Sequence, residues 1–212
     1  MSDKIQFQTP KGVAVYPRLK TPDTKFDDNG QYKADLKVSA DVAKPFITKF
    51  RQVYKDHVGS VLPKKPDRSS KTAFYYFELD DEGEETGDVI FKLRVKNKIT
   101  RKGDLWDRRP AQFDAKGSPI SDPKNVGGGS TLLVAGEVYL WQNPSGGKGM
   151  SLQPEAIQIL DLKEFIAGGK SAGDFGFGSE EGFTDDSSHG FGDETCEDKQ
   201  DTVPADEDDD DY

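Results

Sequence analysis

The sequence predicts a mainly β fold with one inserted helix and a disordered C-terminal tail. Several segments alternate apolar and polar residues over the length of a strand, and one segment repeats apolar residues at spacings of three and four. After about residue 167 aliphatic residues become too sparse to offset the entropy of ordering a chain. We therefore expect one folded domain, residues 1–168, followed by a disordered tail, residues 169–212.

Seven segments have the pattern of β-strands, bounded by Gly, Pro or Asn. The four clearest are Gly12 to Lys20, Gln31 to Val38, Asp88 to Lys98 and Ser130 to Gln142. The weaker ones are Lys71 to Leu79, Leu105 to Phe113 and Met150 to Leu160. The run Asp27-Asp28-Asn29-Gly30 predicts a turn that joins the first two strands into a hairpin.

One segment between these strands has the period of a helix. Its apolar face is predicted to hold Val42, Phe46, Phe50, Val53 and His57. Ser39 or Asp41 is placed to cap the helix, and Pro45 is tolerated because it falls in the first turn. A short second helix is predicted at Asp161 to Ala167.

Five or more strands with one helix and long loops containing Gly and Pro are typical of a small β-barrel. We predict an OB-fold-like barrel, since this barrel often binds oligonucleotides, although a fold does not fix a function. Gly127-Gly128-Gly129-Ser130 lacks the Lys of a phosphate-binding loop and precedes a strand, so we expect a turn or bulge there. The acidic run Asp80 to Glu85 lacks the spacing of a calcium-binding loop and is expected to be a solvated hairpin loop.

The charge of the chain is unevenly distributed. The whole chain has a formal net charge of −10, yet residues 1–168 hold 27 Lys and Arg against 23 Asp and Glu, a net of +4. Residues 169–212 hold 2 basic and 16 acidic residues, a net of −14. The tail ends in a run that should stay extended by self-repulsion: Asp206, Glu207, Asp208, Asp209, Asp210, Asp211 and Tyr212.

The residues that most enzymes and metal sites need are scarce. The two histidines, His57 and His189, and the single Cys196 cannot build a zinc site or an intrachain disulfide. His57 is expected to be a packed helix residue, with a catalytic base as the alternative. We expect no enzyme activity, no cofactor and no metal. The sequence shows no signal-peptide pattern and no membrane-spanning run, so an intracellular protein without a membrane partner is expected.

A row of cations follows one predicted strand. In Asp88 to Lys98 the period of two places Val89, Phe91, Leu93 and Val95 on one face and Lys92, Arg94, Lys96 and Lys98 on the other. The cations would lie about 6 to 7 Å apart, close to the spacing of phosphates along a single strand. The row continues into Arg101 and Lys102. A polyanion groove is the favoured interpretation, and an ordinary solvated strand face is the alternative.

Aromatic residues are interleaved with these cations. On the first strand, the face opposite Val13, Val15 and Leu19 presents Tyr16, Arg18 and Lys20. Trp106 stands beside Arg108 and Arg109, while Tyr139 and Trp141 share one face of their strand. Rings of this kind can stack on bases of any sequence. For Trp106, a half-buried barrel position is an equal alternative. In Phe74-Tyr75-Tyr76-Phe77 one face is expected to be core.

Several of these segments resemble the single-stranded DNA-binding proteins of T-odd phages. The resemblance rests on Gly127-Gly128-Gly129-Ser130 with Leu132 and Val134, on Tyr139-Leu140-Trp141, on the turn Gly146 to Gly149, on Leu152-Gln153-Pro154-Glu155, on Tyr32-Lys33-Ala34-Asp35-Leu36, and on the acidic tail. It implies an OB-fold, binding of single-stranded DNA without sequence preference, and a tail that contacts the replication machinery. By position, Tyr139 matches a base-contacting tyrosine of the family, and Trp141 matches the aromatic residue two positions further on. The chain departs from the family at Tyr212, where Phe is expected, and between Gly103 and Asn125.

The combined expectation is a phage protein that binds single-stranded DNA in the cytoplasm of the host bacterium during replication, recombination and repair. Its tail would compete for the groove and contact replication proteins such as DNA polymerase and helicase-primase, unless it serves only solubility. An acidic DNA mimic or chaperone-like protein is the main alternative, and a metal-dependent nuclease using Glu78, Asp80 and Asp88 is another. The sequence leaves open whether RNA is bound and whether the chain forms a homodimer.

Overall fold

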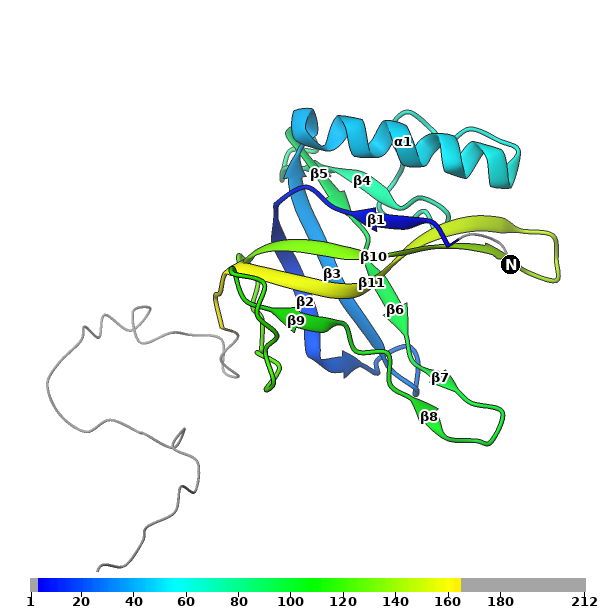
Figure 1. The fold of residues 1–212 in the computed structure, drawn as a ribbon. Helices are drawn as coiled ribbons and strands as arrows, with labels where there is room; N and C mark the ends of the chain where they lie inside the picture. Colours follow the sequence, from blue (N-terminus) through cyan, green and yellow to red (C-terminus); the bar gives the residue numbers. More distant parts are fainter. Residues whose placement is uncertain (1–3, 165–212) are drawn as a thin grey trace, which may run out of the picture. The chain divides into compact units, whose positions relative to one another are not determined.

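A computed structural model of the chain describes residues 4–164. The elements in chain order are β1 (Gln6–Gln8), β2 (Gly12–Asp23), β3 (Gln31–Ser39), α1 (Ala40–Val58), β4 (Tyr75–Leu79), β5 (Glu85–Phe91), β6 (Arg94–Lys96), β7 (Lys98–Ile99), β8 (Leu105–Trp106), β9 (Ala111–Phe113), β10 (Thr131–Gln142) and β11 (Lys148–Asp161) (Figure 1). The predicted boundary at residue 168 and the predicted tail lie outside the described residues. In the described part, no helix has the length and apolar character needed to cross a membrane.

One curved sheet closes into a barrel. β2 pairs with β3, β3 with β5 and β6, and β10 with both β2 and β11, all antiparallel. An isolated parallel bridge between Leu93 and Leu152 joins the β5–β6 segment to β11 and completes the circle. The helix α1 follows β3 and lies across one end of the barrel (Figure 1). The mainly β, OB-fold-like barrel with one inserted helix is therefore confirmed.

The predicted strand Asp88 to Lys98 is divided among β5, β6 and β7, but its pairing with β3 keeps one register. Phe91 lies opposite Leu36, and Arg94 lies opposite Lys33, so no residue is inserted or lost between them. Ala34 N–H donates to the Leu93 carbonyl at 3.0 Å within this stretch. The predicted inward set Val89, Phe91, Leu93 and Val95 is buried. The alternation of the strand is therefore confirmed.

The helix seals the barrel with aromatic side chains. Phe46 and Phe50 face inward as predicted, and the buried face is completed by Ala43 and Tyr54. The prediction for Val42 was wrong, because the buried positions begin one residue later and leave Val42 55% exposed. Ser39 occupies the N-cap position without a side-chain hydrogen bond to the helix.

The strand β2 changes its facing part-way along. The prediction that Val13 and Val15 point inward was wrong, because Ala14 is buried instead, whereas Leu19 further along does face the core. The pairing with β3 shifts between Val15 and Arg18, and Tyr16 has a φ of 46° within that bulge. An extra residue in one strand exchanges the two faces beyond it. The bulge therefore explains why a simple alternation failed here.

Three of the weaker predictions need correction. The strand predicted from Lys71 begins only at Tyr75, and the one predicted over Leu105 to Phe113 is two short strands, β8 and β9. The helix predicted at Asp161 to Ala167 is wrong for its described part: β11 continues to Asp161, and Glu164 forms a bridge with Val126. The backbone there forms hydrogen bonds with a distant segment instead of within a helix, since the Gly127 N–H donates to the Lys163 carbonyl at 2.6 Å.

The predicted turns are confirmed. Gly30 N–H donates to the Asp27 carbonyl at 2.8 Å, which closes the hairpin between β2 and β3. The Asp80 carboxylate accepts the backbone N–H groups of Glu82 and Glu84, so the acidic run forms the β4–β5 hairpin loop. Gly129, with a φ of 87°, turns the chain before β10.

Removal of the Phe50 ring should destabilise the barrel strongly. The ring is 1% exposed, and its centroid lies 4.6 Å from that of Phe46 and 6.4 Å from that of Phe74. Phe50→Ala is expected to lower the free energy of unfolding by about 3–5 kcal/mol, measured by urea denaturation. The matched control, Val42→Ala on the exposed face of the same helix, should change it by less than about 0.5 kcal/mol. Similar losses for both variants would contradict the proposed core.

Candidate nucleic-acid interface

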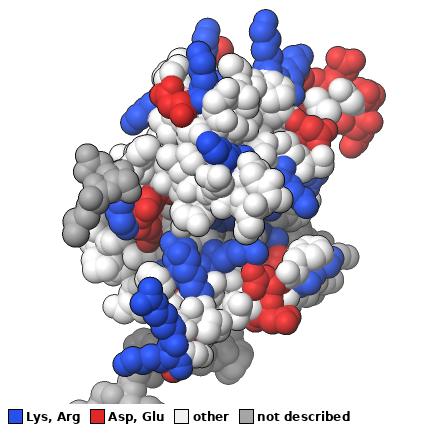
Figure 2. Space-filling model, turned by 90° about the vertical axis from the view of Figure 1, so that its right-hand side faces the viewer, with Lys and Arg blue, Asp and Glu red and all other residues white. Residues whose placement is uncertain are grey.

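A groove of about 640 Å³ opens over the outer face of the β6 region. The residues that line it come from the start of β3, from the loop between α1 and β4, from the segment 92–98, from Arg108 and from the hairpin of β10 and β11. Among them are seven basic side chains and no acidic one: Arg68, Lys71, Lys92, Arg94, Lys96, Lys98 and Arg108. Basic side chains run across a hollow in the face drawn in Figure 2. A lining of one sign favours a polyanionic ligand.

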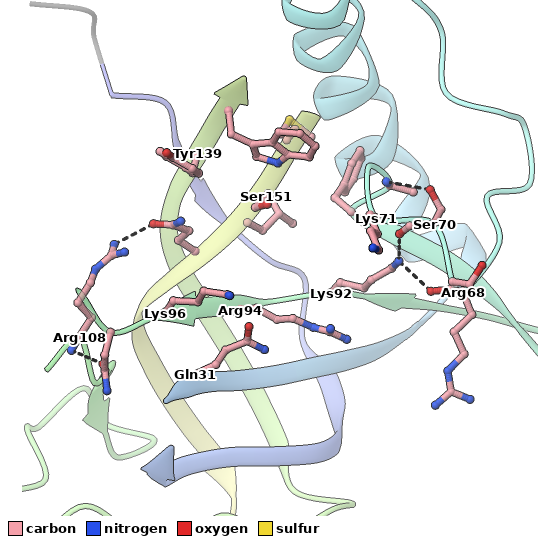
Figure 3. Close-up of a pocket in the computed structure, with 18 of the residues that line it drawn as sticks. Gln31, Arg68, Ser70, Lys71, Lys92, Arg94, Lys96, Arg108, Tyr139 and Ser151 are labelled. Carbon is pink, nitrogen blue, oxygen red and sulfur yellow. Dashed lines mark hydrogen bonds between the residues drawn. The ribbon is translucent and has the colours of Figure 1, made fainter. Parts of the chain in front are cut away.

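The floor of the groove is the predicted row of cations. Lys92, Arg94 and Lys96 project from the same side of the chain, as Figure 3 shows. Two of them form ion pairs at the surface: Arg94 Nη2 lies 3.1 Å from Asp35 Oδ2, and Lys96 Nζ lies 2.8 Å from Asp27 Oδ2. The hydrogen bond from Lys96 holds the pKa of the Asp27 carboxyl below its usual range. These carboxylates fix the cations in place and partly offset their charge.

Lys92 differs from Arg94 and Lys96 because its side chain is half-buried, whereas theirs are exposed. Its ammonium donates to the backbone carbonyls of Ser70 and Arg68, at 2.6 and 3.0 Å, and lies 5.8 Å from the centroid of the Tyr76 ring. Burial lowers the pKa of Lys92. Lys92 therefore contacts the loop that forms one wall of the groove, as the dashed lines in Figure 3 show.

The opposite wall carries the predicted aromatic pair. Tyr139 and Trp141 both line the groove, and Tyr139 is 44% exposed. Trp141 lies against Gly149, which faces it across the β10–β11 ladder, and a Cβ at position 149 would stand 2.1 Å from Trp141 Cζ2. His57 Nε2 lies 3.2 Å from the Trp141 carbonyl oxygen, so the helix also contacts this position. Contacts with Gly149 on β11 and with His57 on α1 therefore hold Trp141 in position.

Trp106 lies beside two cations of the groove, Lys98 and Arg108. Lys98 Nζ lies 5.9 Å from the ring centroids of both Trp106 and Tyr139, and Arg108 Cζ lies 5.6 Å from that of Trp106. Arg108 Nη2 donates to Gln153 Oε1 at 2.8 Å, while its buried Nη1 has no hydrogen-bond partner among the described residues. Trp106 is 55% exposed and does not itself line the groove. The Trp106 ring instead contacts Lys98 and Arg108, which do line the groove.

Other predicted site residues lie apart from the groove. Tyr16, Arg18 and Lys20 belong to β2, and none of them is among the lining residues. Tyr16 instead lines a second hollow, and Lys20 Nζ lies 3.5 Å from Asp122 Oδ1. Arg101 stands in the exposed turn between β7 and β8. The predicted tail contacts, from Asp206 to Tyr212, lie outside the described residues.

The sequence prediction missed the basic loop. Arg68 and Lys71 are exposed and line the groove from the segment between α1 and β4. The pattern that could have identified them is the density of cations, since residues 64–71 contain four Lys or Arg and one Asp. Periodicity gave no indication because the segment forms neither helix nor strand.

Two of the three carboxylates of the nuclease alternative, Glu78 and Asp80, have structural partners. Glu78 accepts a hydrogen bond from Thr86 Oγ1 at 3.0 Å and lies 3.4 Å from Lys37 Nζ, while Asp80 is engaged in its own turn. Within residues 4–164, no three His, Cys, Asp or Glu residues gather in an arrangement that could hold a metal ion. Glu78 and Asp80 therefore have local roles in the β4–β5 hairpin.

Comparison with solved structures finds proteins of the same architecture. The single-stranded DNA-binding protein gp2.5 of bacteriophage T7 superimposes with a TM-score of 0.59 at 19% sequence identity, over 78% of this chain and 97% of that one. This chain has the fold of that protein. The single-stranded DNA-binding protein of bacteriophage Enc34 matches with a TM-score of 0.53 at 17% identity, over 81% of this chain and 90% of that one.

The same Enc34 protein in complex with single-stranded DNA matches with a TM-score of 0.53 at 16% identity, over 76% of this chain and 89% of that one. No protein-family model matches the chain, and no curated protein matches it by sequence. The resemblance inferred from the sequence is thus confirmed at the level of the fold.

A methyl group at position 149 should displace the Trp141 ring. In a Trp106→Phe background Trp141 is the single tryptophan, since the chain has two. Adding Gly149→Ala should shift its emission to longer wavelength and increase its quenching by iodide, because the ring must move off the strand. Gly128→Ala is the control, since its nearest neighbour would be the Ala14 carbonyl oxygen at 3.9 Å. Unchanged emission in the Gly149 variant would contradict the described contact.

Proposed function

We propose that the chain binds single-stranded DNA without sequence preference and that the strand lies in the groove over β6. The observation that carries the proposal is a lining of seven cations, with no carboxylate, together with the exposed Tyr139 and the partly exposed Trp141. Cations attract the phosphates, while rings stack on bases irrespective of sequence. The fold shared with phage single-stranded DNA-binding proteins supports the same function. Duplex DNA conceals the faces of its bases and should bind more weakly.

Within the groove the two walls would have different roles. Arg94, Lys96, Lys98 and Arg108 are proposed to contact phosphates, and Tyr139 and Trp141 are proposed to stack on bases. Arg108 is suited to its role because it lines the groove and is held in place by Gln153 and the Trp106 ring. The residues outside the groove, such as Tyr16 and Arg101, would be reached only by a longer strand.

The biological setting follows from this activity and from the charge of residues 169–212. The protein is proposed to act in the cytoplasm of the host bacterium, where it would protect single strands during phage DNA replication, recombination and repair. The net charge of −14 suits the tail to compete with DNA for the groove. When DNA displaces it, the tail would contact basic surfaces of DNA polymerase and helicase-primase, or link two copies as a homodimer.

Binding should favour single strands and depend steeply on salt. Fluorescence anisotropy with a labelled oligonucleotide should show tighter binding of single-stranded than of double-stranded DNA. The slope of log affinity against log salt should be about −0.7 for each phosphate neutralised, so Lys96→Met should reduce its magnitude by about 0.7. Lys116→Met is the control, because Lys116 is exposed in a turn and does not line the groove. Equal affinity for both forms of DNA at moderate salt would refute the proposal.

Removal of the tail should strengthen DNA binding. Tethering places the tail near the groove at an effective concentration of about 1 mM, so a chain ending at residue 168 should bind single strands roughly tenfold more tightly at low salt. The gain should shrink as salt rises, since both contacts are electrostatic. A full-length chain with the tail acids changed to Asn and Gln should show the same gain. Unchanged affinity in both would argue against competition, and no affinity in residues 1–168 would favour the DNA-mimic alternative.

A further inference from the structure

Several contacts attach the stretch that contains the basic loop to the barrel, among them the ion pair of Lys65 with Glu85 and the hydrogen bond from the Lys92 backbone N–H to the Phe74 carbonyl. No described helix or strand lies between Val58 and Tyr75, so hydrogen bonds and buried side chains must hold this stretch. At its start, Leu62 is buried, and the Arg51 guanidinium donates to the carbonyls of Leu62 and Pro63. Further along, Lys92 donates to the carbonyls of Arg68 and Ser70. The hydrogen bonds of the Lys92 ammonium are the ones that lie beside the groove.

Lys92 has little capacity left for a phosphate. An ammonium group has three N–H donors, and two of them are used by the loop carbonyls. The side chain is half-buried, and its Nζ lies 5.8 Å from the Tyr76 ring centroid, where Arg68 Cζ also lies at 5.8 Å. Arg94 and Lys96, by contrast, are exposed in the same row. Lys92 therefore contacts the loop, although it belongs to the same row of cations as Arg94 and Lys96.

The two cations that the loop brings to the groove depend on these hydrogen bonds. Lys92 holds the carbonyl of Arg68 itself and the carbonyl of Ser70, the residue that precedes Lys71. The backbone on either side of Ser69 is thereby held beside the groove, whose lining includes Arg68 and Lys71. The Arg68 guanidinium lies over the Tyr76 ring, and Arg68 also lines a second hollow of the domain. If these hydrogen bonds are removed, the turn that Asp67 forms with Ser69 and Ser70 would remain, but its attachment to Lys92 beside the groove would be lost.

We propose that Arg68 and Lys71 are phosphate contacts of the groove and that Lys92 is the positioning residue that holds them there. This inference rests on the proposed binding of single-stranded DNA. It reverses the role expected for Lys92 from its place in the row and assigns a function to a loop that the sequence pattern did not single out.

The salt dependence of binding separates a positioning role from a direct contact. If Lys92 positions the loop, Lys92→Met should reduce the magnitude of the log–log salt slope by about 1.4, because two phosphate contacts are lost. The same substitution added to Arg68→Gln with Lys71→Gln should change the slope no further. If Lys92 contacts a phosphate itself, Lys92→Met should reduce the magnitude of the slope by about 0.7 in either background. That additive result would overturn the proposal. Lys96→Met is the matched control and should reduce the magnitude of the slope by about 0.7 in both backgrounds. Lys92→Arg, which keeps the donors, should restore the slope.

Limited digestion with trypsin tests the loop without any DNA. Lys92→Met and Lys92→Gln should both be cut first after Arg68 or Lys71, and faster than the unsubstituted chain or Lys92→Arg. Saturating single-stranded DNA should slow this cleavage in the unsubstituted chain. An unchanged rate of first cleavage in both variants would overturn the positioning role. A chain that did not bind single strands would remove the proposed function, whereas the digestion would still report whether Lys92 holds the loop.

Discussion

The register in which β3 pairs with β5 and β6 is the constraint on which the core and the groove both depend. It directs Val89, Phe91, Leu93 and Val95 into the barrel and the intervening cations outward. A shift of one residue would exchange the two sets and place charges in the core. Leu93 also forms the parallel bridge to Leu152, which brings the hairpin of β10 and β11 alongside the cations. One register thus assembles the barrel and sets the aromatic wall beside the basic floor.

The carboxylates near the groove give its cations a fixed geometry at a small cost in charge. Arg94 and Lys96 are paired with Asp35 and Asp27, whose side chains are less exposed than those of their partners. A pair of this kind at a surface contributes only about 0–1 kcal/mol, so it does not prevent a phosphate from approaching the exposed side of the cation. Side chains that are already ordered lose less entropy when a ligand binds. The pairing therefore holds both cations ready for a ligand while it partly neutralises their charge.

The sequence predicted what depends on short-range pattern and missed what depends on tertiary contact. The period of two in β5 and β6 and the inward Phe46 and Phe50 follow from local order, and the structure agrees. The bulge at Tyr16 inserts a residue that alternation cannot reveal, which is why Val13 was assigned to the wrong face. The basic loop reaches the groove only because Lys92, distant in sequence, binds its carbonyls. The spacing of residues within the loop gives no sign of its contact with Lys92.

Charge, more than the number of aromatic rings, separates the groove from the second hollow of the same domain. That hollow has a volume of about 960 Å³ and contains Tyr16, 78% exposed, together with Tyr76 and Phe77. Its lining, however, includes three cations and four carboxylates, whereas the groove has seven cations and no carboxylate. Stacking supplies about 1–3 kcal/mol for each base, but a phosphate that follows each base must also be accommodated. Repulsion from Glu78, Asp81 and Glu85 would oppose that phosphate, so an exposed ring alone does not make the second hollow a path for the strand.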